Sequence, residues 1–390
     1  MAVALVLAGC SSRQGSQTSS SAPRITRATT LPAAFTGSVA AFYDPPDPLP
    51  HARPGTLIRH QVVGGTATER TWRIMYHSID AAGRDEPVTA LVTFPTRPAP
   101  PRGWPVVSSA PGTVGLNTSC ALSRSDDRPD AFGVTGVAVR TDYIGMVDGQ
   151  RQRYLSGVSE AHSVIDAVRA VRHIPQAHAG SRWVAFGHSQ GGQAALFTNQ
   201  LAASYAPELD LAGTVAGAPA SPLTDLRGPD DRIVPHLVEL LALFGIAADH
   251  PGLDPESYLT HAARRHVDVL EHGCVADIVA TFAGLADHGL FVKNPLTTGP
   301  AAALVRDNEP GRVKAPSPIL LFEGTDDTDV LPARAEAIRS RLCRVGQVTQ
   351  FEVLRGATHG TEIDRARADI SSWIADRLAG QPAPDNCPAG

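Results

Sequence analysis

Short apolar runs separated by turn residues recur along the chain and predict β-strands. Residues 72–78 and 88–94 predict two antiparallel strands joined by a turn-rich segment. Six further strands are predicted at residues 105–108, 134–139, 183–186, 211–216, 319–322 and 350–354. Residues with helical spacing predict helices at 159–174, 192–205, 333–343 and 363–378. Because strands and helices alternate, we expect an α/β fold with a mostly parallel sheet covered by helices on both faces.

The stretch from residue 220 to 306 breaks this alternation. It contains two long amphipathic helix candidates, at residues 233–247 and 255–286, and the second begins with Asp254 as N-cap and Pro255 at the first helical position. We expect a helical insertion that divides one core domain into residues 36–219 and 307–390. Such an insertion is either a lid over a functional site or a packing element without substrate contact.

The N-terminus is apolar up to Cys10 and polar afterwards. Residues 1–10 therefore predict an export signal, and Leu7-Ala8-Gly9-Cys10 matches the lipobox in which the cysteine becomes the lipidated residue of a bacterial lipoprotein. Residues 11–35, which are rich in small polar residues, predict a flexible linker. We expect a protein that is secreted or anchored to the cell envelope.

Charge and cysteine content narrow the function classes further. A net charge of -5 and a pI near 6.3 provide no basic surface for nucleic acid. Apart from Cys10, the chain has four cysteines, Cys120, Cys274, Cys343 and Cys387, and an even number favours disulfides in an exported chain. The sequence leaves three pairings open, and four unpaired thiols are the alternative. No spacing of Cys and His indicates zinc.

The strongest chemical motif is Gly187-His188-Ser189-Gln190-Gly191, which fits the G-x-S-x-G pattern of a serine nucleophile. The pattern alone is weak evidence, but here it follows a predicted strand and opens a predicted helix. Strand, tight turn and helix is the arrangement that exposes a nucleophile and directs a helix N-terminus at a developing oxyanion. We therefore predict Ser189 as the nucleophile; the alternative is a glycine-rich turn without chemistry.

A serine hydroxyl needs a base, and in this arrangement an acid and then a histidine follow the nucleophile along the chain. Asp326, Asp327 and Asp329 lie in the loop after the strand at 319–322, and spacing favours Asp327 as the acid. His359 follows the last predicted strand among small residues, and we predict it as the general base.

Acyl transfer also needs backbone donors for the oxyanion. The loop after the strand at 105–108 contains Pro111-Gly112-Thr113, so Thr113 and the Gln190 N–H are the predicted pair. A structural Pro-Gly turn is the alternative for this loop.

These features together resemble the secretory lipase family of α/β-hydrolases, over residues 42 to 378. The matching motifs are Phe42-Tyr43-x-Pro45-Pro46-x-Pro48-Leu49-Pro50, Gly55-Thr56-Leu57-Ile58-Arg59, Gly112-Thr113-x-Gly115 followed by Cys120, Thr141-Asp142-Tyr143-x-Gly145, Ser159-Glu160-Ala161-x-Ser163-x-x-Asp166-Ala167, residues 187–192, Gly324-Thr325-x-Asp327-x-x-Val330 and His359-Gly360.

The resemblance implies the α/β-hydrolase fold, the triad Ser189, Asp327 and His359, and a helical lid between the core strands. It also implies that Cys120 pairs with Cys274 and that Cys343 pairs with Cys387. Pro111 departs from the family pattern, because related sequences tend to carry His before Gly-Thr.

Asp142 and Tyr143 lie near the site by the same resemblance. For Asp142, a structural role in bonding loop amides is at least as plausible as substrate contact.

The sequence thus predicts a carboxylic ester hydrolase, a lipase or esterase, that forms an acyl-enzyme on a lipid or small-molecule ester. We expect a monomer that needs neither metal nor organic cofactor. The alternatives are an acyltransferase or peptidase with the same triad, and a non-catalytic lipid-binding lipoprotein of the envelope.

Overall fold

The computed structural model describes residues 31–225, 233–285 and 289–388. The predicted signal, the lipidation site Cys10 and most of the predicted linker lie outside these residues. The linker predicted at residues 11–35 extends too far, because residues 31–35 belong to the folded chain. Ala34 forms a β-bridge with His60, and the Phe35 N–H donates to the His60 carbonyl at 2.7 Å, so the folded chain already includes these residues.

A nine-stranded sheet runs through the described residues in the order β1-β2-β3-β5-β4-β6-β7-β8-β9. β1, β2 and β3 are antiparallel to their neighbours, whereas β5, β4, β6, β7, β8 and β9 form a parallel set. The predicted mostly parallel sheet is therefore confirmed. The strands are β1 (Leu57–Gly65), β2 (Glu69–Ile79), β3 (Asp85–Pro95), β4 (Trp104–Ala110), β5 (Val137–Thr141), β6 (Ala179–His188), β7 (Asp210–Gly217), β8 (Ile319–Gly324) and β9 (Thr349–Leu354).

β1 is the strand that the apolar pattern did not predict. It is one of the two edge strands of this sheet, and its side chains are mostly half-buried or exposed, so it lacks the continuous apolar run of a buried strand. Its register with β2 shifts twice, which further blurs a two-residue alternation.

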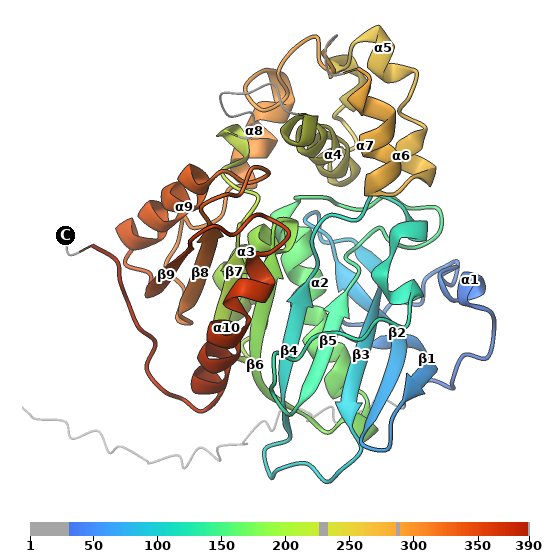
Figure 1. The fold of residues 1–390 in the computed structure, drawn as a ribbon. Coiled ribbons are helices and arrows are strands. Elements are labelled where there is room, and N and C mark those ends of the chain that lie inside the picture. Colours follow the sequence, from blue (N-terminus) through green and yellow to red (C-terminus); the bar gives the residue numbers. More distant parts are fainter. Residues whose placement is uncertain (1–30, 226–232, 286–288, 389–390) are drawn as a thin grey trace, which may run out of the picture. The chain divides into compact units, whose positions relative to one another are not determined.

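Helices cover both faces of the sheet because alternate strand residues point to opposite sides. Ala216 and Leu321 pack with α3 and α9 on one face, whereas Val215 and Leu320 pack with α10 on the other. Figure 1 shows α10 in front of the sheet and α2 and α3 behind it. The helices are α1 (Val39–Phe42), α2 (Gly157–Arg172), α3 (Gln190–Tyr205), α4 (Ile233–Asp249), α5 (His261–Arg264), α6 (Val269–His272), α7 (Val275–Ala283), α8 (Gly299–Asp307), α9 (Pro332–Arg344) and α10 (Glu362–Leu378).

Helices α4 to α8 form a separate layer beyond one end of the strands (Figure 1). They share an apolar cluster that also takes in Leu116, Tyr154 and Leu155 of the core. The predicted helix at 233–247 is present as α4. The single helix predicted at 255–286 is wrong, because this stretch is divided into a 3₁₀ turn at Pro255–Tyr258 and the short helices α5, α6 and α7.

The physical reason for this division is the long-range pairing of two residues within the stretch. Leu259 forms a β-bridge with Phe291, and Cys274 forms a β-bridge with Gly115 and a disulfide with Cys120. Both positions have extended backbone, with φ and ψ of -88° and 149° at Leu259 and of -92° and 178° at Cys274. Asp254 still caps the 3₁₀ turn through the Glu256 N–H, as an N-cap should.

Both disulfides match the pairing that the resemblance implies. Cys120 is bonded to Cys274, and Cys343 is bonded to Cys387. Among the described residues, no helix is both long enough and apolar enough to cross a bilayer.

Candidate active site

Ser189 lies at the sharp turn between β6 and α3, as predicted. Its φ of 60° and ψ of -121° are strained for a residue with a side chain. The turn needs glycine on both sides. A Cβ on Gly187 would lie 1.9 Å from the Gly191 carbonyl oxygen, and one on Gly191 would lie 1.9 Å from the Ala110 oxygen. The motif therefore has the strand, turn and helix geometry that exposes a nucleophile.

Asp327 and His359 meet in the loops that follow β8 and β9. His359 Nδ1 lies 2.6 Å from Asp327 Oδ2, while Asp327 Oδ1 accepts the N–H groups of Asp329 and Val330 at 2.7 and 2.9 Å. Asp327 is buried, whereas Asp326 is exposed. With Nδ1 donating to the carboxylate, the Nε2 atom of His359 is left as a proton acceptor.

Electrostatics favour a charged Asp327 beside His359. Burial raises the pKa of Asp327, but the hydrogen bond and charge of His359, together with the Val330 and Asp329 N–H groups, lower it by more, so that the net pKa falls below its usual value. For His359, burial lowers the pKa and the acidic groups around it, led by Asp327, together raise it by more, so that the net pKa lies above that of an ordinary histidine.

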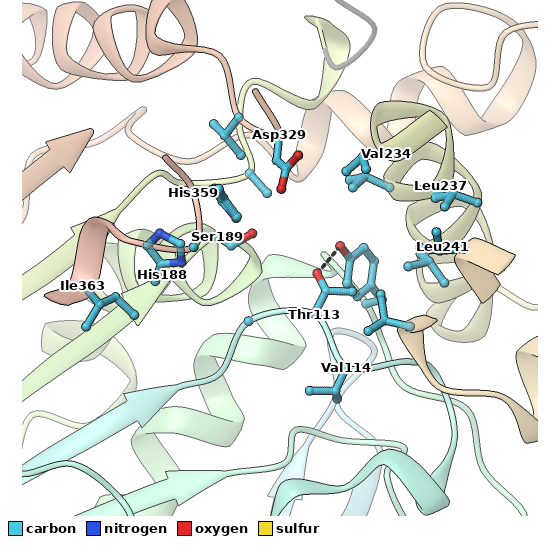
Figure 2. Close-up of a pocket in the computed structure, with 18 of the residues that line it drawn as sticks. Thr113, Val114, His188, Ser189, Val234, Leu237, Leu241, Asp329, His359 and Ile363 are labelled. Atoms are coloured by element: carbon cyan, nitrogen blue, oxygen red, sulfur yellow. Dashed lines mark hydrogen bonds between the residues drawn. The ribbon is translucent and has the colours of Figure 1, made fainter. Parts of the chain in front are cut away.

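The predicted oxyanion loop lies directly against the nucleophile turn. The position of a Cβ on Gly112 is 3.6 Å from the His188 carbonyl oxygen and 3.9 Å from Ser189 Cβ. The Thr113 hydroxyl is paired with the Tyr154 hydroxyl at 2.8 Å (Figure 2). Tyr154 was not predicted from the sequence, and no motif indicated it.

Gln190 is the first residue of α3, so its N–H has no acceptor within the helix. Its side chain is buried and donates to Glu160 Oε1 at 2.6 Å, and the same oxygen accepts the Leu155 N–H at 2.9 Å. Burial raises the pKa of Glu160 to about 8. A neutral Glu160 therefore holds the side chain of Gln190 in place at the start of α3.

Tyr143 and Asp142 have structural contacts near this loop. The Tyr143 hydroxyl donates to the Pro111 carbonyl at 2.9 Å and so supports the loop in which Pro111 departs from the family pattern. Asp142 accepts the Ser123 N–H at 2.9 Å and the Thr89 hydroxyl at 2.6 Å, and it does not line the cavity described next. Its contacts agree with the structural role considered from the sequence.

Ser189, His359 and Thr113 line one cavity of about 560 Å³. Figure 2 shows Ser189 and His359 on one side and the apolar side chains of α4 on the other. The α4 and α7 residues in its wall are Val234, Leu237, Val238, Leu241, Val275 and Val279. The cavity is thus apolar on the side of the helical insertion and polar around the serine.

A second set of polar residues lies next to the predicted triad. His188 Nε2 is 3.0 Å from Glu362 Oε2, and the ring centroids of His188 and His359 are 4.6 Å apart. Glu323, Asp327 and Glu362 form a buried carboxyl cluster. Imidazole and carboxylate groups can bind a metal ion, but most of these side chains already form hydrogen bonds with one another or with backbone N–H groups. The sequence motif contains His188 but indicated no role for it, and nothing in the sequence indicated Glu323 or Glu362.

The sequence model of the secretory lipase family matches residues 133–386, more than half of the chain. The chain belongs to the secretory lipase family. This membership places it among the carboxylester hydrolases of the α/β-hydrolase fold.

Individual relatives of this secretory lipase are distant. "Probable inactive lipase MT1628" of Mycobacterium tuberculosis is 24% identical over 384 residues, which cover 88% of this chain and 83% of the relative. "Secreted triacylglycerol lipase LIP2" of Malassezia globosa is 23% identical over 381 residues, which cover 89% of this chain and 82% of the relative.

Among solved structures, Candida antarctica lipase A has a TM-score of 0.70 and 18% identity, with 89% of this chain and 87% of that chain covered. The rice cell wall degrading esterase LipA of Xanthomonas oryzae also has a TM-score of 0.70 and is 17% identical, with 85% of this chain and 100% of that chain covered. At these identities the likeness establishes the shared fold.

Proposed function

We propose that this secretory lipase hydrolyses carboxylic esters through a Ser189, Asp327 and His359 triad and an acyl-enzyme intermediate. The observation that carries the proposal is the hydrogen bond between His359 Nδ1 and buried Asp327, because His359 lines the same cavity as Ser189. Family membership sets the reaction class, and the geometry supports these residue roles.

In the proposed reaction, His359 Nε2 takes the Ser189 proton while the serine oxygen attacks the ester carbonyl. The oxyanion is held by the N–H of Gln190 and by the N–H or hydroxyl of Thr113. The protonated His359 gives its proton to the leaving alcohol, and water then releases the acid by the same sequence. Asp327 orients the imidazole and stabilises its charged form.

We further propose that the insertion at 220–306 is a lid and that its α4 and α7 residues bind the acyl chain. Support comes from the apolar wall that these helices contribute opposite Ser189. An alkyl chain in that space would bury apolar surface, which favours binding by roughly 25 cal/mol per Å². A lipid ester fits such a wall better than a charged peptide does.

Export is part of the proposal. Two disulfides persist in an oxidising compartment, and the Malassezia relatives are named as secreted proteins. Anchoring through Cys10 is the more specific form of this proposal, and incorporation of labelled palmitate into wild type but not into Cys10→Ser tests it.

Hydrolysis of p-nitrophenyl esters by wild type and Ser189→Ala tests the proposed chemistry. We expect wild type to turn over and to react with a fluorophosphonate, and Ser189→Ala to lose about 10⁴-fold or more of kcat and all labelling. Activity that survives in Ser189→Ala would reassign the nucleophile.

The relative named as an inactive lipase makes the non-catalytic alternative worth measuring directly. A wild-type chain that is folded but neither hydrolyses esters nor reacts with the fluorophosphonate would support a lipid-binding role instead. Transfer of the acyl group to an added alcohol or amine in place of water would indicate an acyltransferase.

A further inference from the structure

Glu362, the first residue of α10, is fully buried directly behind the predicted triad. Its Oε2 atom lies 3.0 Å from His188 Nε2, and its Oε1 atom accepts the Gly324 N–H at 2.8 Å. His188 immediately precedes Ser189, and Gly324 ends the strand that leads to Asp327. One carboxyl group therefore joins the turn of the nucleophile to the strand that carries the acid.

Glu362 also belongs to a cluster of three buried carboxyl groups. Oxygen atoms of Glu323, Asp327 and Glu362 all lie within 4.8 Å of one another, and each of the three side chains is at most 2% exposed. Within the described ranges, neither Glu323 nor Glu362 forms an ion pair with Lys or Arg. Three adjacent anions in such a place would be strongly disfavoured, so the cluster must hold protons.

The surroundings decide which carboxyl group keeps its charge. Asp327 has His359 and two backbone N–H groups as donors, which favour its anion. The Glu323 oxygens lie beside the other two carboxyl groups, to which only a protonated carboxyl can donate. The titratable groups that face Glu362 are His188 beside Ser189, Glu323 of β8, Asp327 of the next loop and His359. On α10 itself the nearest charged residues are Asp364 and Arg365, and both are exposed.

We propose that Glu362 is a positioning residue for the ester hydrolysis: as a neutral carboxyl it binds His188 and the end of β8, and so holds Ser189 and Asp327 in register without placing a second anion beside Asp327. This inference rests on the proposed function of the triad. Glu362 touches neither the reacting atoms nor the cavity, and it acts through its two neighbours.

The pKa directions agree with this geometry. Burial, and then the charge of Asp327, raise the pKa of Glu362 well above its usual value, and burial and the neighbouring acids do the same for Glu323. Burial, and then the charge of His359, lower the pKa of His188 to about 3, so His188 is neutral at working pH. A neutral His188 Nε2 can accept the proton of the Glu362 carboxyl.

Glu362→Gln tests the charge state, because its amide oxygen can still accept from Gly324 and its amide nitrogen can still donate to His188. We expect kcat within about threefold of wild type, and the acid limb of kcat/KM at an unchanged pH. Glu362→Leu keeps the volume but loses both bonds, and we expect kcat to fall by at least about tenfold with little change in KM. The matched control is Asp364→Asn, which removes an exposed acid from the same first turn of α10 and should leave both kcat and KM unchanged.

Two results would overturn the inference. If Glu362→Gln loses as much activity as Glu362→Leu, or if its acid limb moves to lower pH, then Glu362 acts as an anion near His359. If Glu362→Leu keeps full kcat, then it positions nothing. Should Glu362→Leu fail to fold, the Gln variant alone still decides the charge state. An inert wild type would instead contradict the proposed function, so the two failures are distinguishable.

Discussion

Asp327 differs from its neighbours in the same loop by burial and by the donors that reach its carboxylate. Two backbone N–H groups and His359 all donate to it, whereas Asp326 is exposed and Asp329 is half-buried in the cavity wall. A carboxylate with three donors stays charged when buried and holds the imidazole in one tautomer. These properties are what a triad acid requires.

Asp327→Asn should lower kcat by about 10³ to 10⁴-fold, because the amide can donate to His359 and so favours the wrong tautomer. Steady-state kinetics with a soluble p-nitrophenyl ester measure the effect. Asp326→Asn is the matched control in the same loop, and it should leave kcat within about twofold of wild type. An equal loss in both variants would contradict the assignment.

The raised pKa of His359 predicts where activity is lost on the acid side. As the proposed general base, His359 must be neutral to act, so kcat/KM should fall as the pH drops through its pKa, and a raised pKa places this midpoint above 6.5. In Asp327→Asn the carboxylate that raises the pKa is gone, and the midpoint of the residual activity should move to lower pH. A pH profile of kcat/KM from 5 to 9 measures both; a wild-type midpoint below 6.5 would be inconsistent with this electrostatic balance.

At the scale of elements, α4 provides much of the apolar wall of the cavity. Val234, Leu237, Val238 and Leu241 recur at helical spacing along one face of α4 and line the cavity opposite Ser189. This same periodicity predicted the helix from sequence. Its use as a cavity wall depends on the position of α4 against the core.

Changes at Leu241 should alter the preference for acyl chain length. Leu241→Phe adds bulk to the wall and should lower kcat/KM for long-chain esters more than for acetate, whereas Leu241→Ala should shift the preference toward longer chains. A series of p-nitrophenyl esters gives the ratios, and thermal unfolding of each variant controls for stability. Unchanged ratios in both variants would place the acyl chain elsewhere.

At the scale of the folded chain, the contacts that attach the helical insertion to the core include one at the end of α4 and one at the start of α7. Asp249, at the end of α4, accepts hydrogen bonds from Ser156 and Ser159 of the core. The Cys120–Cys274 disulfide joins the start of α7 to the segment after β4, beside a bond from the Val275 N–H to the Val114 carbonyl at 2.8 Å. The same segment carries Thr113, so the insertion and the predicted oxyanion loop are mechanically linked.

The two disulfides should therefore differ in their effect on activity. Replacing either pair by serines should cost about 2–4 kcal/mol of unfolding free energy, because each closes a long loop. Loss of Cys120–Cys274 should also lower kcat, since Val275 and Thr113 line the cavity. Loss of Cys343–Cys387, which joins the end of α9 to the C-terminal tail, should leave kcat near wild type in the folded protein. Denaturant titrations and kinetics separate the two effects, and equal kcat losses would argue against the linkage.

Local patterns predicted the parallel strands, the four core helices and α4, because burial on a sheet or a helix face imposes a period on neighbouring residues. They also predicted the turn at Ser189, where strand, glycines and helix follow one another directly. The order Ser189, Asp327 and His359 could be read for the same reason, since each follows a predicted strand.

Only the tertiary structure decided the features that depend on residues distant in sequence. The helix predicted at 255–286 is divided by pairings of Leu259 and Cys274 with residues elsewhere in the chain. Glu362 comes to lie beside His188 because α10 packs across the sheet, 174 positions away along the chain. A buried carboxyl has no sequence periodicity to reveal it, so its partners and its charge become visible only when the chain has folded around it.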